Sequence, residues 1–130
     1  MKKEEVITII IMGIIIAIDI ITQKNLDKSV DLTSKSLSDI KEKVIQNEQV
    51  SDEELEQDTQ RTYNEWKERC NELSYFIEHE GMKEVNLNLE KAKIQFKMGE
   101  KEEAVAEINE GIYKLNYIKN KQKLNLSNIF

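Results

Sequence analysis

The residues best suited to acid–base or metal chemistry are adjacent in the sequence, in Glu78-His79-Glu80, which contains the single histidine of the chain. A histidine beside two carboxylates can bind a metal ion or act as a general base. Successive residues of a helix point about 100° apart, however, so these three side chains cannot converge on one ion. We expect His79 to be an exposed or end-of-helix residue, and we predict no catalytic residue here.

The single cysteine is the other reactive group. One cysteine cannot form an intrachain disulfide, and Cys70 with His79 alone cannot build a Cys/His zinc site. Cys70 falls on an apolar helical face with no basic residue placed to activate it, which predicts a buried, inert thiol. No glycine-rich phosphate loop is present, and a net charge of −6 argues against a nucleic-acid-binding surface. We therefore expect no enzyme activity, no cofactor and no metal site.

Exposed aromatic residues indicate binding rather than catalysis. Tyr75 is predicted on the outer face of its helix, close to His79. Tyr113 and Tyr117 lie one helical turn apart and are predicted on the outer face of the last helix. These four residues form the candidate partner surface. The chain ends in the apolar tail KLNLSNIF, which we expect to dock over Tyr113 and Tyr117.

The N-terminal segment is predicted to be a membrane anchor. Residues 6–18 carry no charge, Asp19 follows, and Ile20 and Ile21 close the run. A helix over residues 6–21 rises about 24 Å, which is short of a hydrocarbon core of about 30 Å, and local thinning with lysine snorkelling closes the difference. The anchor residues are Val6, Ile7, Ile9, Ile10, Ile11, Met12, Gly13, Ile14, Ile15, Ile16, Ala17 and Ile18.

Three interpretations of this segment stay open. An uncleaved anchor is favoured, because a signal peptide needs a small-x-small cleavage site and the residue two before Ala17 is Ile15. A core helix would need more partner core than the remaining, highly charged chain supplies. The flanking lysines do not decide the orientation, since Lys3 precedes the run and Lys24 follows it. The short N-terminal tail favours an N-inside, C-outside arrangement.

Composition divides the chain into three parts: residues 1–21 as the anchor, 22–50 as a polar helical stalk, and 51–130 as a helical bundle domain. Every aromatic residue lies at or after Tyr63. The stalk carries a narrow apolar stripe at helical spacing, which predicts either that it lies along the following domain or that two copies pair as a parallel homodimer. The stripe comprises Leu26, Val30, Thr33, Leu37, Ile40 and Val44.

The rest of the chain has the pattern of an all-α fold, since proline is absent and only four glycines interrupt the helical periodicity. Ser51 and Glu54 predict a capping box at the start of a helix that ends near Gly81. A helix over residues 82–98 follows, and Gly99 ends it before the last helix begins. We predict an antiparallel bundle of three to four helices.

The apolar positions predict which helical faces are buried. The middle helix is apolar on two faces, so we expect it to lie between neighbours. Gly111 of the last helix is expected to permit a close helix approach. The predicted core positions are Leu55, Thr59, Thr62, Trp66, Cys70, Leu73 and Ile77 on the first helix, Met82, Val85, Leu89, Ala92 and Phe96 on one face of the second with Leu87, Ile94 and Met98 on the other, and Ala104, Val105, Ile108, Ile112 and Leu115 on the last.

The second half of the chain resembles a known family. The positions that carry the resemblance are Trp66, Phe76, His79-Glu80, Leu89, Lys93, Ala104 and the closing Asn128-Ile129-Phe130. Together they resemble the uncharacterised domain family 4363, small proteins of spore-forming Gram-positive bacteria with an N-terminal hydrophobic segment. The chain departs from the family where Gly81 and Lys83 replace acidic residues after the His-Glu pair. The resemblance implies an anchor, a helical domain and a location in the bacterial envelope, and it assigns no activity to any residue.

These observations predict a single-pass protein of the cell membrane whose helical domain lies outside the cytoplasm. Its partners would be the lipid bilayer and an envelope or membrane protein, and we expect no nucleic acid. The first alternative is a sensor domain that responds to a small ligand or ion. The second is a secreted helical protein released by signal cleavage.

Overall fold

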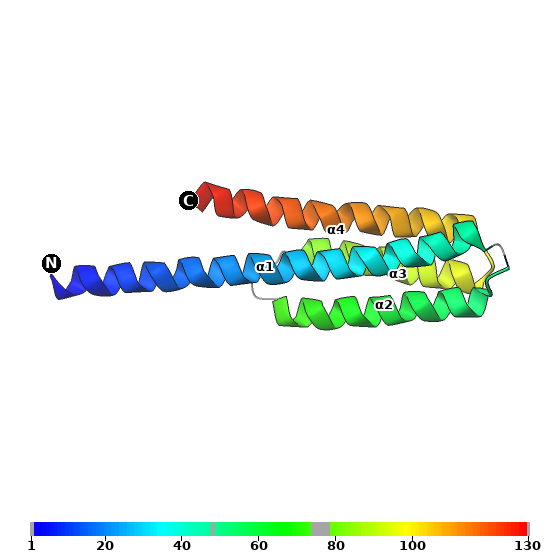
Figure 1. The fold of residues 1–130 in the computed structure, drawn as a ribbon, viewed down its shortest axis with the longest axis horizontal. Helices are drawn as coiled ribbons and strands as arrows, with labels where there is room; N and C mark the ends of the chain where they lie inside the picture. Colours follow the sequence, from blue (N-terminus) through cyan, green and yellow to red (C-terminus); the bar gives the residue numbers. More distant parts are fainter. Residues whose placement is uncertain (1, 48, 74–78, 130) are drawn as a thin grey trace.

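The chain folds into helices alone over the part that the computed structural model describes, which is residues 2–47, 49–73 and 79–129, with the backbone only for 122–129. The four helices are α1 (Lys3–Gln46), α2 (Asp52–Leu73), α3 (His79–Lys97) and α4 (Lys101–Ile129) (Figure 1). The prediction of an all-α fold with a long apolar N-terminal helix and a bundle is confirmed.

The four helices form an antiparallel bundle in which each helix has two main neighbours. Helix α1 packs against α2 and α4, and α3 packs against the same two, so α1 and α3 lie diagonally opposite. The α1–α2 and α3–α4 connections lie at one end of the bundle (Figure 1). The N-terminal half of α1 projects from the other end, beyond α2 and α3.

Residues 22–46 of α1 pack along the bundle and form one of its four helices. They continue the apolar segment without a break in the helix, which contains no proline between Lys3 and Gln46. The predicted stripe faces α2 and α4, which is the first of the two interpretations. Thr33 at a stripe position is fully buried and accepts a hydrogen bond from Arg69 Nη1 of α2 at 3.1 Å. The stripe residues buried with Thr33 are Leu26, Val30, Leu37 and Ile40.

The core follows the predicted face of α2 and the first predicted face of α3. On α4, Val105 and Ile112 are only half-buried, and Ile118, which was not predicted, is buried. The buried positions of α2 repeat every three or four residues, as expected for one face of a helix. Ile77 lies outside the described residues. The largest fully buried side chains of the bundle are Trp66, Phe96, Leu26, Leu37, Leu55, Leu89, Ile108 and Leu115.

The start of α2 is capped by one half of the predicted capping box. The Ser51 hydroxyl oxygen accepts a hydrogen bond from the Glu54 backbone N–H at 3.1 Å. The Glu54 carboxylate does not return to the Ser51 backbone. It lies 3.4 Å from Lys43 Nζ at the end of α1, because α1 ends close to the first turn of α2 and presents a cation there.

The predicted end of α2 near Gly81 is wrong. Gly81 lies in the first turn of α3, which begins at His79. A Cβ atom at Gly81 would stand 3.2 Å from Ile118 Cγ1 of α4, which is tighter than ordinary contact. The glycine signal therefore marks a close approach of α3 to α4. At Gly111, where the close approach was expected, the nearest atom to a Cβ would be Asn88 Cβ at 3.6 Å, an ordinary distance.

The second apolar face of α3 is exposed, contrary to the expectation that α3 lies between neighbours on both faces. Leu87 is 50% exposed, Ile94 48% and Met98 66%. In a four-helix bundle each helix buries one stripe between its two neighbours, and the opposite face has no helix left to cover it.

Gly99 ends α3 in a left-handed conformation with φ of 78°. The Gly99 N–H donates to the Phe96 carbonyl at 3.1 Å, and the Glu100 N–H donates to the Gln95 carbonyl at 2.8 Å. This pair of hydrogen bonds is a Schellman motif, which satisfies carbonyls that the helix end leaves open. The predicted helix end at Gly99 is confirmed.

We expect opposite effects from the same substitution at two glycines. Gly99→Ala should lower the free energy of unfolding by about 1–2 kcal/mol, because a Cβ disfavours the left-handed conformation. Gly111→Ala should raise it by about 0.5–1 kcal/mol, because alanine loses less backbone entropy within a helix and its Cβ finds ordinary contacts. Urea unfolding followed by circular dichroism measures both values. Equal effects at the two positions would contradict the assignment of Gly99 as the helix end.

The C-terminal tail does not fold back over the two tyrosines. Helix α4 continues to Ile129, so the tail forms its last turns and extends beyond the two tyrosines in the direction of the N-terminal half of α1. Tyr113 stays 71% exposed and Tyr117 58%. The expected docking of the tail on these residues is therefore wrong, because a continuing helix moves each residue about 1.5 Å farther along the axis.

Candidate functional site

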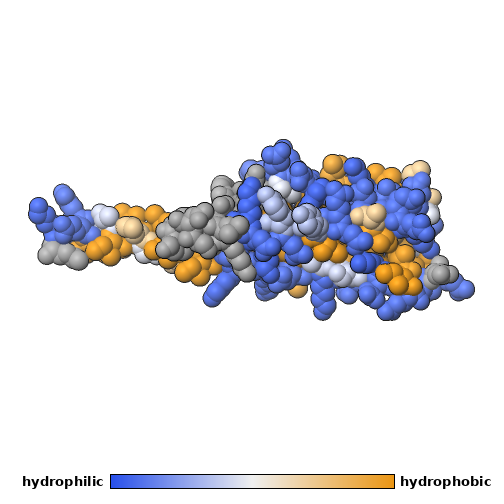
Figure 2. All heavy atoms as spheres, turned by 90° about the horizontal axis from the view of Figure 1, so that it is seen from above, coloured by the Kyte–Doolittle hydropathy of each residue, from blue (hydrophilic) through white to orange (hydrophobic). Residues whose placement is uncertain are grey.

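The projecting part of α1 is an exposed apolar helix. Its large apolar side chains are between 40% and 58% exposed, and only 6% of its most apolar 18-residue window is buried, with a mean hydropathy of 2.5. Figure 2 shows hydrophobic residues along this projection, in contrast to the largely hydrophilic bundle. The exposed apolar residues are Val6, Ile7, Ile9, Ile10, Ile11, Met12, Ile14, Ile15, Ile18, Ile20 and Ile21.

Helix α1 is long and apolar enough to cross a membrane by length and composition. A signal sequence near an N-terminus meets the same criterion, and so does the core helix of a soluble protein, which is mostly buried. The low burial of this window distinguishes it from a typical core helix. Gly13 has open space around the position of a Cβ, and Ala17 is exposed. Of the predicted anchor residues only Ile16 is half-buried, and the others are exposed.

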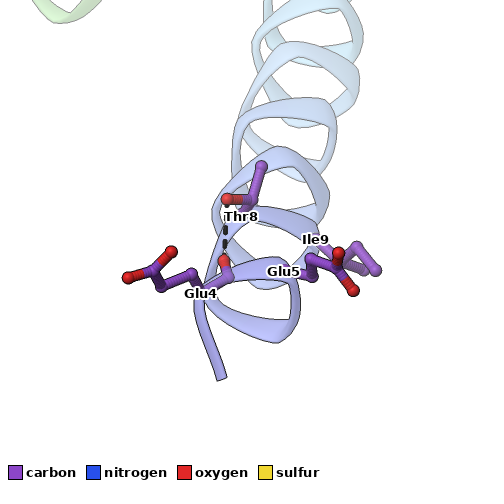
Figure 3. Close-up of a pocket in the computed structure, with 4 residues that line it drawn as sticks. All are labelled: Glu4, Glu5, Thr8 and Ile9. Carbon is purple, nitrogen blue, oxygen red and sulfur yellow. Dashed lines mark hydrogen bonds between the residues drawn. The ribbon is translucent and has the colours of Figure 1, made fainter. Parts of the chain in front are cut away.

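A shallow depression on the first turns of α1 offers no constellation for chemistry. Glu4, Glu5, Thr8 and Ile9 line it, and all four come from the same helix (Figure 3). The Thr8 hydroxyl donates to the Glu4 backbone carbonyl at 2.9 Å. Figure 3 shows the carboxylates of Glu4 and Glu5 pointing to opposite sides of the helix, so they do not form a pair that could share a proton or a cation.

The residues of the candidate partner surface lie on two helices. His79 is exposed at the start of α3, and Tyr113 and Tyr117 are exposed on α4. Gly81 approaches Ile118 closely, so the first turn of α3 lies level with Tyr117 along the bundle. Tyr75, the fourth predicted residue, lies outside the described residues.

A second exposed apolar surface lies on α3 and was not predicted as a partner site. It consists of Leu87 and Ile94 of α3 and of Met98, which directly follows the helix, and these residues recur at intervals of seven and four. Their apolar character was visible in the sequence. Only the packing of α3 against α2 and α4 shows that this face meets no other described helix of the chain.

Cys70 is buried in the core of α2 with 7% of its surface exposed. Burial raises the pKa of the Cys70 thiol to about 12, because the thiolate would lose its hydration. The thiol is therefore protonated at neutral pH and is a poor nucleophile. The predicted buried thiol is confirmed.

We expect Cys70 in the folded protein to resist alkylation by iodoacetamide at pH 8. Both burial and the raised pKa lower the concentration of accessible thiolate. In urea the same thiol should react at the rate of an ordinary cysteine, and mass spectrometry would follow both reactions. Rapid alkylation of the folded protein would show that α2 does not bury this face.

The most buried carboxylate of the described part, Asp58 of α2, forms an ion pair with a lysine of α1. Asp58 is 7% exposed, and its two oxygens lie 2.6 Å from Lys43 Nζ and 3.0 Å from Arg61 Nη2. The hydrogen bond to Asp58 raises the pKa of Lys43 above its usual value. Both cations are partly exposed, so this cluster is an ion-pair contact at the surface of the bundle. Among the residues described, no three His, Cys, Asp or Glu side chains are placed to hold a metal ion.

Comparison with known proteins assigns the chain to a family without assigning an activity. A family model described as "Domain of unknown function (DUF4363)" matches residues 20–129. No curated protein and no solved structure matches the chain. The matched region contains residues 22–46 of α1 together with α2, α3 and α4, and it begins where the apolar segment ends. Because the match covers most of the sequence, the chain belongs to the DUF4363 family.

Proposed function

We propose that this protein is a single-pass membrane protein that displays an acidic four-helix bundle outside the cytoplasm. In this proposal residues 6–21 cross the bilayer. The bundle of α2, α3, α4 and the second half of α1 contacts another protein of the bacterial envelope or membrane. The membrane location of the protein and the side of the membrane on which the bundle lies are parts of this proposal.

The observation that supports the proposal is the continuity of α1. One helix contains both the exposed apolar segment and a buried face of the bundle. An uninterrupted helix holds the bundle at a fixed distance from the apolar segment, as a protein that presents a binding surface above a membrane requires. A flexible linker of glycine and serine would allow wide variation in that distance.

Cell fractionation with mass measurement of the N-terminus tests the anchor. Full-length protein retained in the membrane fraction after alkaline carbonate washing is the expected result. A shorter, soluble form would show that the segment is a cleaved signal and that the bundle is released. Protease added outside intact cells should degrade the bundle, and protection in intact cells with degradation after lysis would reverse the proposed orientation.

Photo-crosslinking tests the partner surface. Tyr117 is 58% exposed on α4, and a photoreactive amino acid at this position should give a discrete crosslinked product in living cells. Glu68 is an exposed residue of α2 and is the matched control. The proposal expects a product from Tyr117 and none from Glu68. The same products at both positions, or none at either, would contradict a contact through this surface.

A further inference from the structure

The second half of α4 differs in charge from the rest of the chain. After Glu110 the sequence contains no aspartate or glutamate, although the whole chain has a net charge of −6. Glu110 itself pairs with Lys114 at 3.2 Å, and this hydrogen bond lowers the pKa of Glu110. Four lysines occupy this segment, namely Lys114, Lys119, Lys121 and Lys123. The C-terminal part of α4 is therefore a basic region of an acidic protein.

The geometry of the bundle brings this basic region toward the apolar segment of α1. Helices α1 and α4 run antiparallel, and Lys119 Nζ lies 3.0 Å from Asp31 Oδ1. Ten residues beyond Lys119 is Ile129, the last residue of α4, and ten residues before Asp31 is Ile21. Each helix rises about 15 Å over that distance. Helix α4 therefore ends level with Ile21, where the apolar run also ends, and Figure 1 shows its end beside α1.

The other two helices stop short of this level. Arg69 of α2 donates to Thr33 of α1, so Leu73 at the end of α2 lies level with Ser29. Ser29 lies about 12 Å along α1 from Ile21.

Gly81 of α3 lies against Ile118 of α4. The start of α3 at His79 therefore lies level with Asn120, about 13 Å short of the end of α4. Among the described residues, the last two turns of α4 are therefore the part of the bundle that comes nearest to the apolar run.

We propose that residues 119–129 of α4 are a second membrane contact, which binds the headgroups of anionic phospholipids. The inference rests on the proposed function, since it requires residues 6–21 to cross the bilayer. In that arrangement the backbone of Lys123 lies level with Asp27, about 9 Å from the end of the apolar run, a distance close to the Debye length of about 8 Å at physiological salt. The segment also contains Leu124, Leu126 and Ile129, and a basic segment with apolar residues is typical of helices that bind a membrane surface.

An acidic protein partner would also complement these lysines. The lipid surface is favoured because the segment ends level with the apolar run, whereas Tyr113 and Tyr117 lie farther up the bundle. Each lysine near an anionic surface strengthens binding by up to about fivefold, so three lysines set an upper limit of roughly a hundredfold. Lys119 contributes less than Lys123, because it pairs with Asp31 and lies farther from the apolar run.

Fluorescence quenching by labelled lipids tests this contact in the full-length chain. Separate Ile14→Cys, Asn128→Cys and Glu100→Cys variants would carry a fluorescent label, while the buried Cys70 stays unlabelled under native conditions. Each variant is reconstituted into vesicles of phosphatidylcholine alone, or of phosphatidylcholine and phosphatidylglycerol in equal parts. Spin labels on the acyl chains or on the headgroups report which depth each position reaches.

The expected result is quenching of Ile14→Cys by acyl-chain labels in both vesicles and no quenching of Glu100→Cys. Asn128→Cys should be quenched by headgroup labels, more strongly with phosphatidylglycerol than without it, and high salt should remove the difference. Combining Asn128→Cys with Lys119→Gln, Lys121→Gln and Lys123→Gln should also remove it. The matched combination with Lys91→Gln, Lys93→Gln and Lys97→Gln on α3, which changes the net charge equally, should not.

The outcomes separate the two proposals. If Ile14→Cys is quenched and Asn128→Cys responds equally to both vesicles, the anchor stands and the anionic-lipid contact is wrong. If the two lysine combinations have equal effects, the response comes from net charge and the site is wrong. If Ile14→Cys is not quenched by acyl-chain labels, the membrane anchor itself is wrong, and the contact that depends on it fails too.

Discussion

Substitution of Ile14 by lysine is expected to move the protein from the membrane fraction toward the soluble fraction. Ile14 lies near the middle of the apolar run and is 54% exposed. A lysine at the centre of a membrane helix costs about 2.5–3.5 kcal/mol, which corresponds to roughly a 70- to 400-fold change in the membrane–water distribution. Sodium carbonate extraction followed by immunoblotting of both fractions measures the change.

Ile94→Lys is the matched control for this prediction. Ile94 is 48% exposed on α3, so both substitutions replace an exposed isoleucine of a helix by lysine. Ile94 belongs to the bundle, and its substitution should leave the membrane distribution unchanged. Retention of both variants in the membrane fraction would contradict the assignment of residues 6–21 as the membrane segment. Release of both would indicate a general loss of folding, which circular dichroism detects.

Trp66→Ala is expected to give the largest loss of stability in the bundle. Trp66 is fully buried and is the largest fully buried side chain described. Replacement of a buried Trp or Phe by Ala costs about 3–5 kcal/mol, because apolar contacts are lost and a cavity remains. A domain of this size is stable by about 5–15 kcal/mol, so the variant loses a large part of its stability. Urea unfolding should be followed by circular dichroism, since Trp66 is the single tryptophan.

Two further variants show whether the effect comes from packing. Trp66→Phe should lower the free energy of unfolding by much less than Trp66→Ala does. An aromatic ring stays in the core, and the buried Nε1–H, which has no hydrogen-bond partner, is removed. Tyr117→Ala on the exposed face of α4 should change the free energy of unfolding by about 0.5 kcal/mol or less. A Trp66→Ala variant as stable as Tyr117→Ala would contradict the buried position of this side chain.

Much of the fold could be predicted because the helical period and the end signals are local. The buried face of α2, the Ser51 cap and the end of α3 at Gly99 depend on neighbours within one or two turns. Gly81 shows where local reasoning fails. A glycine near the end of an apolar stripe is typical of a helix end, but here it accommodates Ile118, which lies far along the chain.

The candidate sites also differ in whether local sequence signals could predict them. The exposed positions of His79, Tyr113 and Tyr117 follow from their place opposite the apolar stripes. The exposed apolar face of α3 does not, because Leu87 and Ile94 are as apolar as many residues of the core. Whether an apolar face is buried depends on the number of neighbouring helices, and that number is a property of the whole bundle.

By itself the amino-acid sequence determined the helical class, the apolar N-terminal segment, the buried position of the cysteine and the family resemblance. Each of these depends on residue type and on short-range periodicity. Tertiary structure alone decided that residues 22–46 join the bundle and that α4 ends level with Ile21. Both are relations between helices far apart in sequence, and they are set by packing between side chains such as Thr33 with Arg69 and Asp31 with Lys119.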